Sequence, residues 1–444
     1  MATELLRSGR AVRRSLAVAG ALAATALVLA GCSGTGSSSA GGAPSGTLHI
    51  AVSSADASDA AFKAVNTAFE KKYPDVNVKF DAIPNNNYNA AKSSRLTAGN
   101  VDILIAAPVQ VPKYVTTDSA SDDDRSADAG AFLDLTHESF LKNYTPSLLD
   151  SIAYKGKQYT VPTGVSYYTG VFYNKAIFQK YGLSVPTTWA EFQKVCDTLQ
   201  AAGVAPLGIG GKDSWPAGLT MLAAVQGLYP TQQDKNALAK DLWTQKASLD
   251  SGKPAEVLDR VSTIYKYAQT NFAGVSYASI PAAFAAGQFA MTPDGTWDQT
   301  TIDAAVGGKF DYGYFPIPTS DTAADNQLLG GKVDLRLAVP SSTKNKTAAL
   351  AYLKFFSDPK NYATFVKISG TAPAEPNIPA SDFLKGIAPY TSTFSPAWDT
   401  IWIANSKAGQ TATFPFNYTG VAPLGSGTAS QAAAASEKDW KAGF

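Results

Sequence analysis

The feature that most constrains the fold is a repeated switch between strand-like and helix-like hydrophobic periodicity. Residues 47–52 alternate between more and less apolar side chains, which predicts a strand with one face more buried than the other. Apolar residues then recur at helical spacing over 62–69, and the alternation of a strand returns over 76–80. The uninterrupted apolar run over 103–107 is typical of a strand buried on both faces. This order predicts an α/β fold with a mainly parallel sheet.

The N-terminus has the layout of an export signal. Four arginines within the first 14 residues precede an uncharged run of small and apolar residues over 15–31. A transmembrane helix is the weaker interpretation, because about 20 apolar residues are needed to span a bilayer comfortably. The run ends in Leu29-Ala30-Gly31-Cys32, which resembles the lipobox of bacterial lipoproteins. We therefore expect removal of 1–31, two acyl chains on Cys32 that anchor the protein to the outer face of the cell membrane, and a flexible Ser/Gly tether over 32–46.

Composition excludes several classes of protein. Lysine and arginine total 37 against 36 for aspartate and glutamate, without the clustered basic excess that a nucleic-acid partner requires. Even without its first 31 residues, the chain is too long for one typical core and suits two domains. The 7 Trp, 20 Tyr and 21 Phe exceed what a core of this size needs, and Trp and Tyr offer flat apolar faces with a polar edge.

Cys196 is predicted to be a core residue. Thr188 and Glu191 form a T-x-x-E capping box that starts a helix. On that helix Cys196 shares one face with apolar residues. With Cys32 acylated, no internal disulfide is available, so packing alone must stabilise the domains.

The segment 119–130 is polar and acidic, and contains Asp122-Asp123-Asp124. We expect a solvated surface loop there. A tight calcium site needs oxygen ligands at alternating positions and a turn glycine, and this pattern is missing. No metal site is predicted.

Catalytic motifs are also missing. The only histidines are His49, inside the first predicted strand, and His137. His137-Glu138 opens like a zinc protease motif, but Leu141 stands where the second histidine belongs. Neither a G-x-S-x-G elbow nor a phosphate-binding loop occurs. We expect no enzymatic activity and no cofactor, with a glycosidase carboxylate pair left as an alternative because its geometry is invisible in a sequence.

Several motifs follow one another in an order more specific than any one of them: Gly156-Lys157-Gln158-Tyr159-Thr160-Val161-Pro162, Tyr173-Asn174-Lys175, Pro186-Thr187-Thr188-Trp189-Ala190-Glu191-Phe192, Phe284 to Met291, Gly295-Thr296-Trp297, Tyr314-Phe315-Pro316-Ile317-Pro318 and Tyr352-Leu353-Lys354-Phe355-Phe356. This order resembles family 1 of the bacterial extracellular solute-binding proteins and covers most of 47–444. The acidic segment 119–130 matches no part of it.

The resemblance implies a two-lobed α/β protein of the periplasmic-binding type, in which crossing hinge segments join the lobes and the ligand lies in the cleft between them. It also implies that the closed form docks on an ABC permease, and we expect the protein to be a monomer. The predicted lobes are 47–165 plus 332–373, and 166–331 plus 374–444.

Candidate ligand-binding residues follow from the chemistry of sugars, which pair stacked aromatic rings with carboxylates and amides that hydrogen-bond hydroxyls. Trp297 is the strongest, because it follows Asp294-Gly295 in a turn and matches the family position whose ring packs on sugar. Trp402 follows Trp398 at i+4, so Trp398 fits a core helix face equally well. The other candidates lie near predicted strand ends and crossovers: Asp294, Tyr167, Tyr168, Trp398, Trp215, Asp213, Asp56, Ser54 and Gln110.

These features predict the lipid-anchored receptor of an ABC importer, which captures a mono- or oligosaccharide. A non-sugar solute such as a polyamine is the nearest alternative, favoured by a cleft with few aromatic rings and a cluster of like charges. A surface adhesin or signalling lipoprotein is an alternative of a different class, and predicts a filled space between the lobes. A glycosidase is the enzymatic alternative.

Overall fold

A computed structural model describes residues 42–444, with the side chain of Asp56 excepted. These residues form one compact unit. The predicted signal, Cys32 and most of the predicted tether lie outside the described residues. Within 42–444 no helix combines the length and the apolar character needed to cross a membrane.

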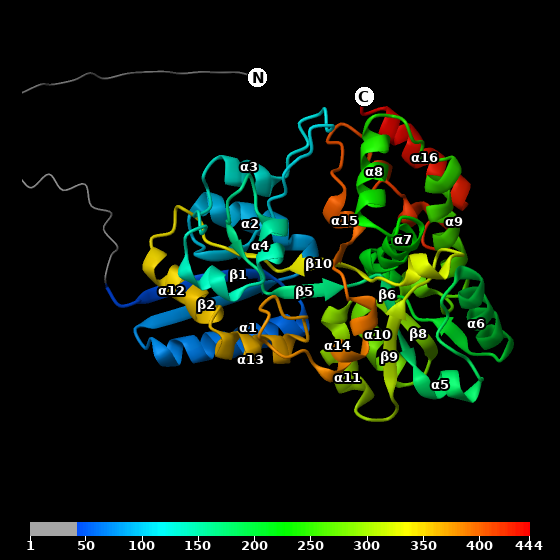
Figure 1. The fold of residues 1–444 in the computed structure, drawn as a ribbon, viewed down its shortest axis with the longest axis horizontal. Coiled ribbons are helices and arrows are strands. Elements are labelled where there is room, and N and C mark those ends of the chain that lie inside the picture. The colour runs from blue at the N-terminus through cyan, green and yellow to red at the C-terminus, as the bar shows by residue number, and fades with distance from the viewer. Residues whose placement is uncertain (1–41) are drawn as a thin grey trace, which may run out of the picture. The chain divides into compact units, whose positions relative to one another are not determined.

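The first sheet has five strands in the order β2-β1-β3-β11-β4 (Figure 1). Its central strand β1 pairs in parallel with β2 and β3, whereas β11 is antiparallel to both β3 and β4. Leu48, Ile50 and Val52 on β1 are almost completely buried, as their alternation predicts. The strands are β1 (Gly46–Ser53), β2 (Val76–Ile83), β3 (Ile103–Ile105), β4 (Thr160–Val161) and β11 (Leu337–Ala338).

Helices cover this sheet. The first one, α1 (Asp56–Lys72), packs against α13 (Pro359–Ser369), a helix from much later in the chain (Figure 1). Phe62 on α1 and Phe365 on α13 meet edge to face with ring centroids 4.9 Å apart. The remaining helices associated with this sheet are α2 (Asn85–Ala98), α3 (Asp122–Asp128), α4 (Pro146–Ile152) and α12 (Lys346–Phe356).

The second sheet has four strands in the order β7-β8-β6-β9. Strand β6 is antiparallel to β8 and β9, and only β7 and β8 run in parallel. The expectation of a mainly parallel sheet, drawn from residues 47–107, holds for β2, β1 and β3 but not for β11 and β4. The second sheet is mainly antiparallel, because β6 runs opposite to both of its neighbours. The strands are β6 (Gly170–Asn174), β7 (Ala205–Leu207), β8 (Phe289–Asp294) and β9 (Tyr312–Pro316).

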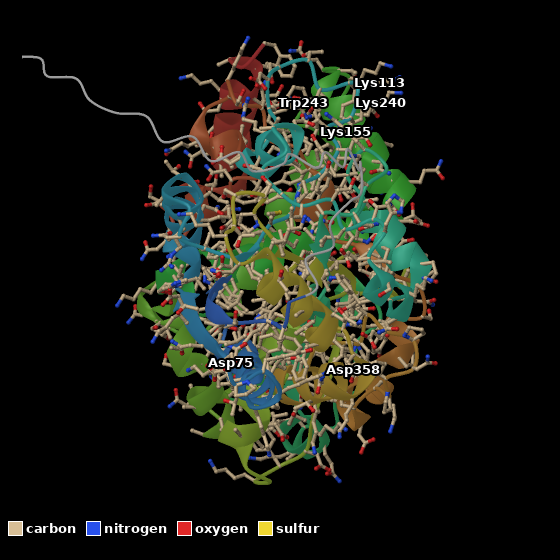
Figure 2. The ribbon with its side chains drawn as sticks, turned by 90° about the vertical axis from the view of Figure 1, so that its left-hand side faces the viewer. Asp75, Lys113, Lys155, Lys240, Trp243 and Asp358 are labelled. Atoms are coloured by element: carbon tan, nitrogen blue, oxygen red, sulfur yellow. The ribbon has the colours of Figure 1, made fainter. Side chains whose placement is uncertain are left out.

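Helices also surround the second sheet. The predicted capping box of Thr188 and Glu191 starts α6, and Cys196 on that helix is fully buried, which confirms both predictions. On α8, Lys240 is exposed, whereas Trp243 is buried in the core (both are labelled in Figure 2). The helices are α5 (Lys175–Lys180), α6 (Trp189–Ala201), α7 (Trp215–Leu228), α8 (Gln232–Trp243), α9 (Gly252–Lys266), α10 (Ile280–Ala285), α11 (Gln299–Val306), α14 (Asp382–Gly386), α15 (Trp398–Ile401) and α16 (Ala429–Lys441).

A third sheet, in the order β12-β10-β5, lies where the chain passes between the two larger sheets. Strands β5 (Gly164–Tyr167) and β10 (Gly330–Asp334) are antiparallel, and β12 (Ser395–Pro396) pairs in parallel with β10. A side chain at Gly331 would put its Cβ 2.7 Å from the Ser166 carbonyl oxygen. Glycine therefore permits this close strand contact. The predicted lobe boundaries at 165/166 and 331/332 fall within these strands and stay predictions.

The acidic segment is not a solvated loop. Residues Asp122–Asp128 form α3, whose N-cap is Ser121 in a capping box with Asp124. Asp124 is 1% exposed and accepts the Val109 amide at 2.6 Å, while Asp123 accepts Lys92 Nζ at 2.6 Å. Asp124 caps the N-terminus of α3, and Asp123 pairs with a buried lysine. The polarity of the segment alone does not reveal these partners.

Candidate functional site

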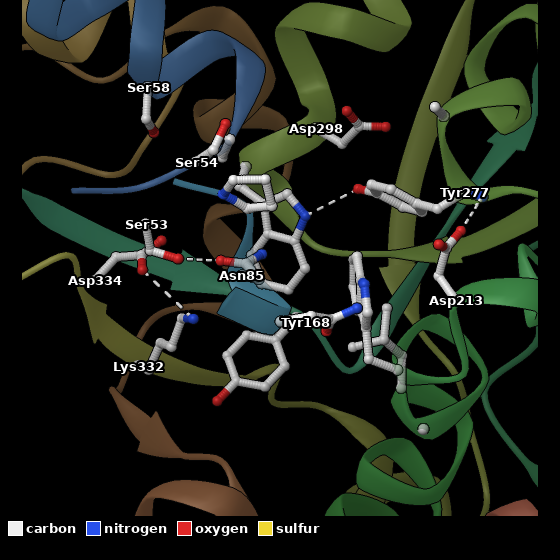
Figure 3. Close-up of a pocket in the computed structure, with 18 of the residues that line it drawn as sticks. Ser53, Ser54, Ser58, Asn85, Tyr168, Asp213, Tyr277, Asp298, Lys332 and Asp334 are labelled. Atoms are coloured by element: carbon white, nitrogen blue, oxygen red, sulfur yellow. Dashed lines mark hydrogen bonds and ion pairs between the residues drawn. The ribbon is translucent and has the colours of Figure 1, made fainter. Parts of the chain in front are cut away.

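A cavity of about 560 Å³ opens among the first sheet, the second sheet and strand β10. Its volume lies within the usual range of small-molecule sites. Figure 3 shows its walls, which contain side chains from segments far apart in the sequence.

Small polar residues form the wall contributed by the first sheet. Strand β1 ends at Ser53, and the turn into α1 places Ser54 and Ser58 on the cavity. Asn85, the first residue of α2, accepts a hydrogen bond from the Ser53 hydroxyl (Figure 3). Ser54 Oγ donates to Asp59 Oδ2 at 2.6 Å. This wall offers hydroxyl and amide groups and no aromatic ring.

Aromatic rings form the opposite wall. Trp215 starts α7, Trp297 lies in a short turn after β8, and Tyr168 directly follows β5. Ring centroids are 4.5 Å apart for Trp215 and Tyr277, and 5.3 Å apart for Tyr168 and Trp297. A Cβ at Gly295 would lie 2.4 Å from the Trp297 ring, so glycine there lets the ring fold back.

Trp297 is held by a chain of hydrogen bonds. Its indole Nε1 donates to the Tyr277 hydroxyl at 3.2 Å, and that hydroxyl donates to Asp294 Oδ1 at 3.0 Å. Asp294 is fully buried. Burial, followed by the negative charge of Asp298, raises the pKa of Asp294 well above its usual range.

A lysine between two aspartates closes the cavity at β10. Lys332 Nζ lies 3.4 Å from Asp334 Oδ1, and 5.3 Å and 5.7 Å from the ring centroids of Trp297 and Tyr168. Asp399 Oδ1 accepts the Tyr168 hydroxyl at 2.7 Å. Burial favours the neutral amine of Lys332, but the charges of Asp334 and Asp399 outweigh it, so the pKa of Lys332 is raised.

The pKa of Asp399 is also raised. The side chain of Asp399 is exposed at the cavity, but the surrounding protein shields it from bulk water. This desolvation favours the neutral form more strongly than the Tyr168 hydroxyl and the Lys332 charge favour the carboxylate. The lysine, the two aspartates and the tyrosine form one connected polar group whose atoms face the cavity. It can both donate to and accept from a bound polar molecule.

Five of the predicted residues lie on the cavity wall: Ser54, Tyr168, Asp213, Trp215 and Trp297. They come from four separate stretches of the chain, and the fold brings them together. Asp213 ends a short turn before α7 and accepts the Tyr277 amide at 2.8 Å (Figure 3). Their contact with a ligand stays a prediction.

Four others do not line the cavity. Asp294 lies behind Trp297, and Tyr167 points to the other side of its strand, since successive residues alternate. Trp398 is 1% exposed and stacks on Trp402 with centroids 5.3 Å apart, the core arrangement that the i+4 spacing allowed. Gln110 is exposed and lies five residues after the end of β3 at Ile105, so it is not at the strand end that faces the cavity. Asp56 starts α1, and its side chain lies outside the described atoms.

Several cavity residues were not predicted from the sequence. Lys332 and Asp334 follow Gly330-Gly331 at the predicted lobe boundary 331/332, and this position could have marked them. Asp399 directly follows the candidate Trp398. Tyr277 carries no local signal, because its place depends on contacts with Asp213 and Asp294. Other lining residues that the sequence did not predict are Ser53, Asn85, Asp298, Phe414 and Tyr418.

A fold with two sheets, joined by crossing strands and with a cavity between them, is typical of solute-binding proteins. The profile described as "Bacterial extracellular solute-binding protein" matches residues 53–363, more than half of the chain. The chain belongs to this family.

Two relatives and two solved structures illustrate the similarity. The multiple sugar-binding protein of Streptococcus mutans is 26% identical over 320 residues, which cover 70% of this chain and 71% of the relative. A probable sugar-binding periplasmic protein of Mesorhizobium japonicum is 28% identical over 273 residues, 59% of this chain and 63% of the relative. The fold matches "SBP RafE in complex with raffinose" with a TM-score of 0.73 at 23% identity, covering 89% of this chain and 99% of that one. It matches a chitin oligosaccharide binding protein with a TM-score of 0.72 at 21% identity, covering 90% and 99%.

Proposed function

We propose that this protein is the carbohydrate receptor of an ABC importer. The observation that carries the proposal is the cavity, which pairs the rings of Tyr168, Trp215 and Trp297 with hydroxyl, amide and carboxylate groups. Sugars present weakly apolar ring faces and hydroxyl edges, and this combination recognises both. The relatives named as sugar-binding proteins support the same ligand class.

Each wall has its own role. The aromatic wall takes the face of a sugar ring, and Lys332 donates to hydroxyl oxygens while Asp334 and Asp399 accept from hydroxyl protons. The opposite wall, with Ser53, Ser54 and Asn85, closes over the other side of the ligand.

Capture proceeds by movement of the two lobes about the connecting strands. Strands β5 and β10 carry the chain between the sheets, and Lys332 and Asp334 lie on β10 itself. A ligand that contacts both walls and β10 stabilises the closed arrangement over the open one. The closed protein then docks on the membrane permease. The lipid anchor at Cys32, the outer face of the cell membrane as location and the monomeric state belong to this proposal.

No covalent step is part of the proposed function. The cavity wall has neither histidine nor cysteine among the described residues. Two of its carboxylates are engaged, Asp334 with Lys332 and Asp399 with the Tyr168 hydroxyl. This arrangement supports binding without hydrolysis.

A thermal-shift screen tests the proposal. The chain from Ser33 onward is mixed with mono- and oligosaccharides, amino acids and polyamines. A ligand at 100 times its dissociation constant stabilises the folded state by about 2.7 kcal/mol. We expect one family of saccharides to raise the melting temperature and to be recovered unchanged by chromatography. A shift from amino acids or polyamines alone, or hydrolysis of the saccharide, would contradict the proposal.

A further inference from the structure

The cavity wall has more negative than positive side chains. Among its lining residues are Asp213, Asp298, Asp334 and Asp399, and of the described residues that line it only Lys332 carries a positive charge. The side chains on this wall are therefore acidic on balance, although the protein as a whole is nearly neutral. A low-dielectric cavity lined by one sign of charge attracts groups of the opposite sign.

Lys332 compensates only one side of the cavity. Its ammonium lies 3.4 Å from Asp334 and interacts electrostatically with Asp399. Both of these aspartates are already served by protein donors, since Ser166 Oγ donates to Asp334 Oδ2 at 2.6 Å and the Tyr168 hydroxyl donates to Asp399. A bound cation would therefore be attracted less strongly to Asp334 and Asp399 than to a carboxylate without a neighbouring lysine.

Asp213 lies on the other side, beside the aromatic rings. Its Oδ2 accepts the Tyr277 amide at 2.8 Å, and within residues 42–444 no lysine or arginine forms an ion pair with it. Its side chain is half-buried, and it reaches the cavity together with Trp215 and Tyr277, whose ring centroids are 4.5 Å apart (Figure 3). A carboxylate next to aromatic faces is an arrangement that binds organic cations.

We propose that the cavity prefers saccharides that carry a protonated amine, with Asp213 as the partner of the ammonium, and disfavours saccharides that carry a carboxylate. This inference rests on the proposed function. Aromatic walls alone indicate a neutral sugar, and a cluster of acidic groups alone indicates a polyamine. A cavity that combines both features fits an aminated saccharide, whose ring stacks while its ammonium pairs with the carboxylate.

Matched sets of probes test the preference. Each set contains the 2-amino-2-deoxy form, the N-acetylated form and the uronic acid of one sugar, taken from glucose, galactose and mannose, together with glucosamine oligomers and their N-acetylated counterparts. Calorimetric titration of the exported chain at pH 7 gives the dissociation constants. Within the set that binds, we expect the amine form to bind about tenfold tighter than its N-acetylated counterpart, and the uronic acid to bind weakest.

An Asp213→Asn variant identifies the residue responsible. Asparagine keeps the shape and an oxygen for the Tyr277 amide but removes the charge, so the ratio of the affinities for the amine and for its N-acetylated counterpart is expected to fall to about one, whatever the change in overall affinity. The control is Asp150→Asn, which makes the same change of charge at an exposed residue that does not line the cavity. The control should keep the tenfold preference.

The outcomes separate this inference from the function on which it rests. Binding of neutral and aminated forms with equal affinity overturns the inference and leaves the carbohydrate receptor intact. A preference that survives in Asp213→Asn overturns the role of Asp213. Binding of spermidine, added as a further probe, without binding of any saccharide overturns both proposals. Failure of every probe to bind overturns this inference alone, since the carbohydrate receptor is tested by the wider thermal-shift screen. If Asp213→Asn does not fold, the ratio of affinities in the unaltered protein and its decrease from 50 to 500 mM salt, expected for an ion pair, still decide the inference.

Discussion

Two groups of tryptophans in this protein have opposite environments. Besides Trp189, which is buried in a separate core, four core tryptophans, Trp243, Trp398, Trp402 and Trp440, are at most 7% exposed. Each of their indole N–H groups donates to a backbone carbonyl: Trp243 to Ile403, Trp398 to Phe414, Trp402 to Thr413 and Trp440 to Leu242. The cavity tryptophans, Trp215 and Trp297, are half-buried. Trp297 donates instead to the Tyr277 hydroxyl, which is held in turn by buried Asp294.

The difference shows which tryptophans stabilise the fold and which are available to a ligand. A backbone acceptor is fixed by the fold and does not titrate, so the core tryptophans are positioned at any pH at which the protein is folded. The position of Trp297 depends on a side-chain hydroxyl and a titratable carboxyl. The comparison therefore predicts that the core tryptophans govern stability, whereas Trp297 governs affinity and responds to its polar partners.

The largest expected effect is on stability. Trp440→Ala removes a ring that is 1% exposed, and should lower the free energy of unfolding by about 3–5 kcal/mol. Urea denaturation followed by circular dichroism measures this change. The affinity of the folded fraction for its saccharide should stay within about threefold of the unaltered protein. A stable Trp440→Ala variant with lost affinity would break the comparison.

Trp297→Ala should have the opposite profile. The loss of a stacking face is expected to weaken saccharide binding by about 1–3 kcal/mol, with a smaller loss of stability than Trp440→Ala causes. Calorimetric titration gives the affinity, and Trp297→Phe is the matched variant that keeps a ring and should retain part of it. Unchanged affinity with a lower melting temperature would assign Trp297 to the core group.

The pH dependence of stability should reveal Asp294. Its pKa is raised in the folded state by burial and by Asp298, whereas an unfolded aspartate titrates near 4. The folded state therefore holds the proton to higher pH, and this contribution to stability is complete below about pH 4 and is lost as pH rises through the folded pKa.

The slope from this one proton is at most about 1.4 kcal/mol per pH unit. Asp294→Asn should lack it, and Trp440→Phe should keep it, when unfolding is measured from pH 4 to 9. Buried Glu375, whose pKa is raised to about 8 by burial and by Asp358, adds a slope of the same sign. It is present in every variant, so the difference between Asp294→Asn and the unaltered protein isolates Asp294. Identical slopes in these two proteins would show that Asp294 is not protonated in the folded state.

The smallest expected effect concerns Tyr277. Tyr277→Phe removes the hydroxyl between Trp297 and Asp294, and should weaken saccharide binding by about 0.5–1.5 kcal/mol. The control Tyr229→Phe removes a hydroxyl from a tyrosine that does not line the cavity. Equal affinities of both variants and the unaltered protein would mean that the hydrogen bond does not position Trp297.

The parts of the fold that could be predicted are those with a strong local signal. Alternation and helical spacing predicted β1, the helix α1 that follows it, and β2, and the capping box predicted the start of α6. The order of motifs predicted the family. The helix at Asp122–Asp128 was missed, because the partners that make its aspartates buried, Lys92 and the Val109 amide, are distant or have no sequence signature.

The candidate site, too, could be predicted only where a residue has a strong local signal. Trp297 could be found because a turn glycine precedes it and no helix face offers it a core position. The sequence could not decide whether Trp398 belongs to the site or to the core, since its spacing to Trp402 also fits a helix face. The fold shows that the indoles of Trp398 and Trp402 both donate to backbone carbonyls in the core. Tyr277 reaches the cavity through contacts with Asp213 and Asp294 that no local pattern encodes. Lys332 follows a glycine pair, but its place beside Tyr168 and Trp297 depends on the fold.

A crystal structure of the protein with the saccharide that gives the largest thermal shift tests the central claim most directly. We predict one saccharide in the cavity, with a sugar ring stacked on Trp297 and hydroxyl groups within hydrogen-bonding distance of Lys332 or Asp334. A saccharide bound elsewhere, with the cavity between the two walls empty, would contradict the account.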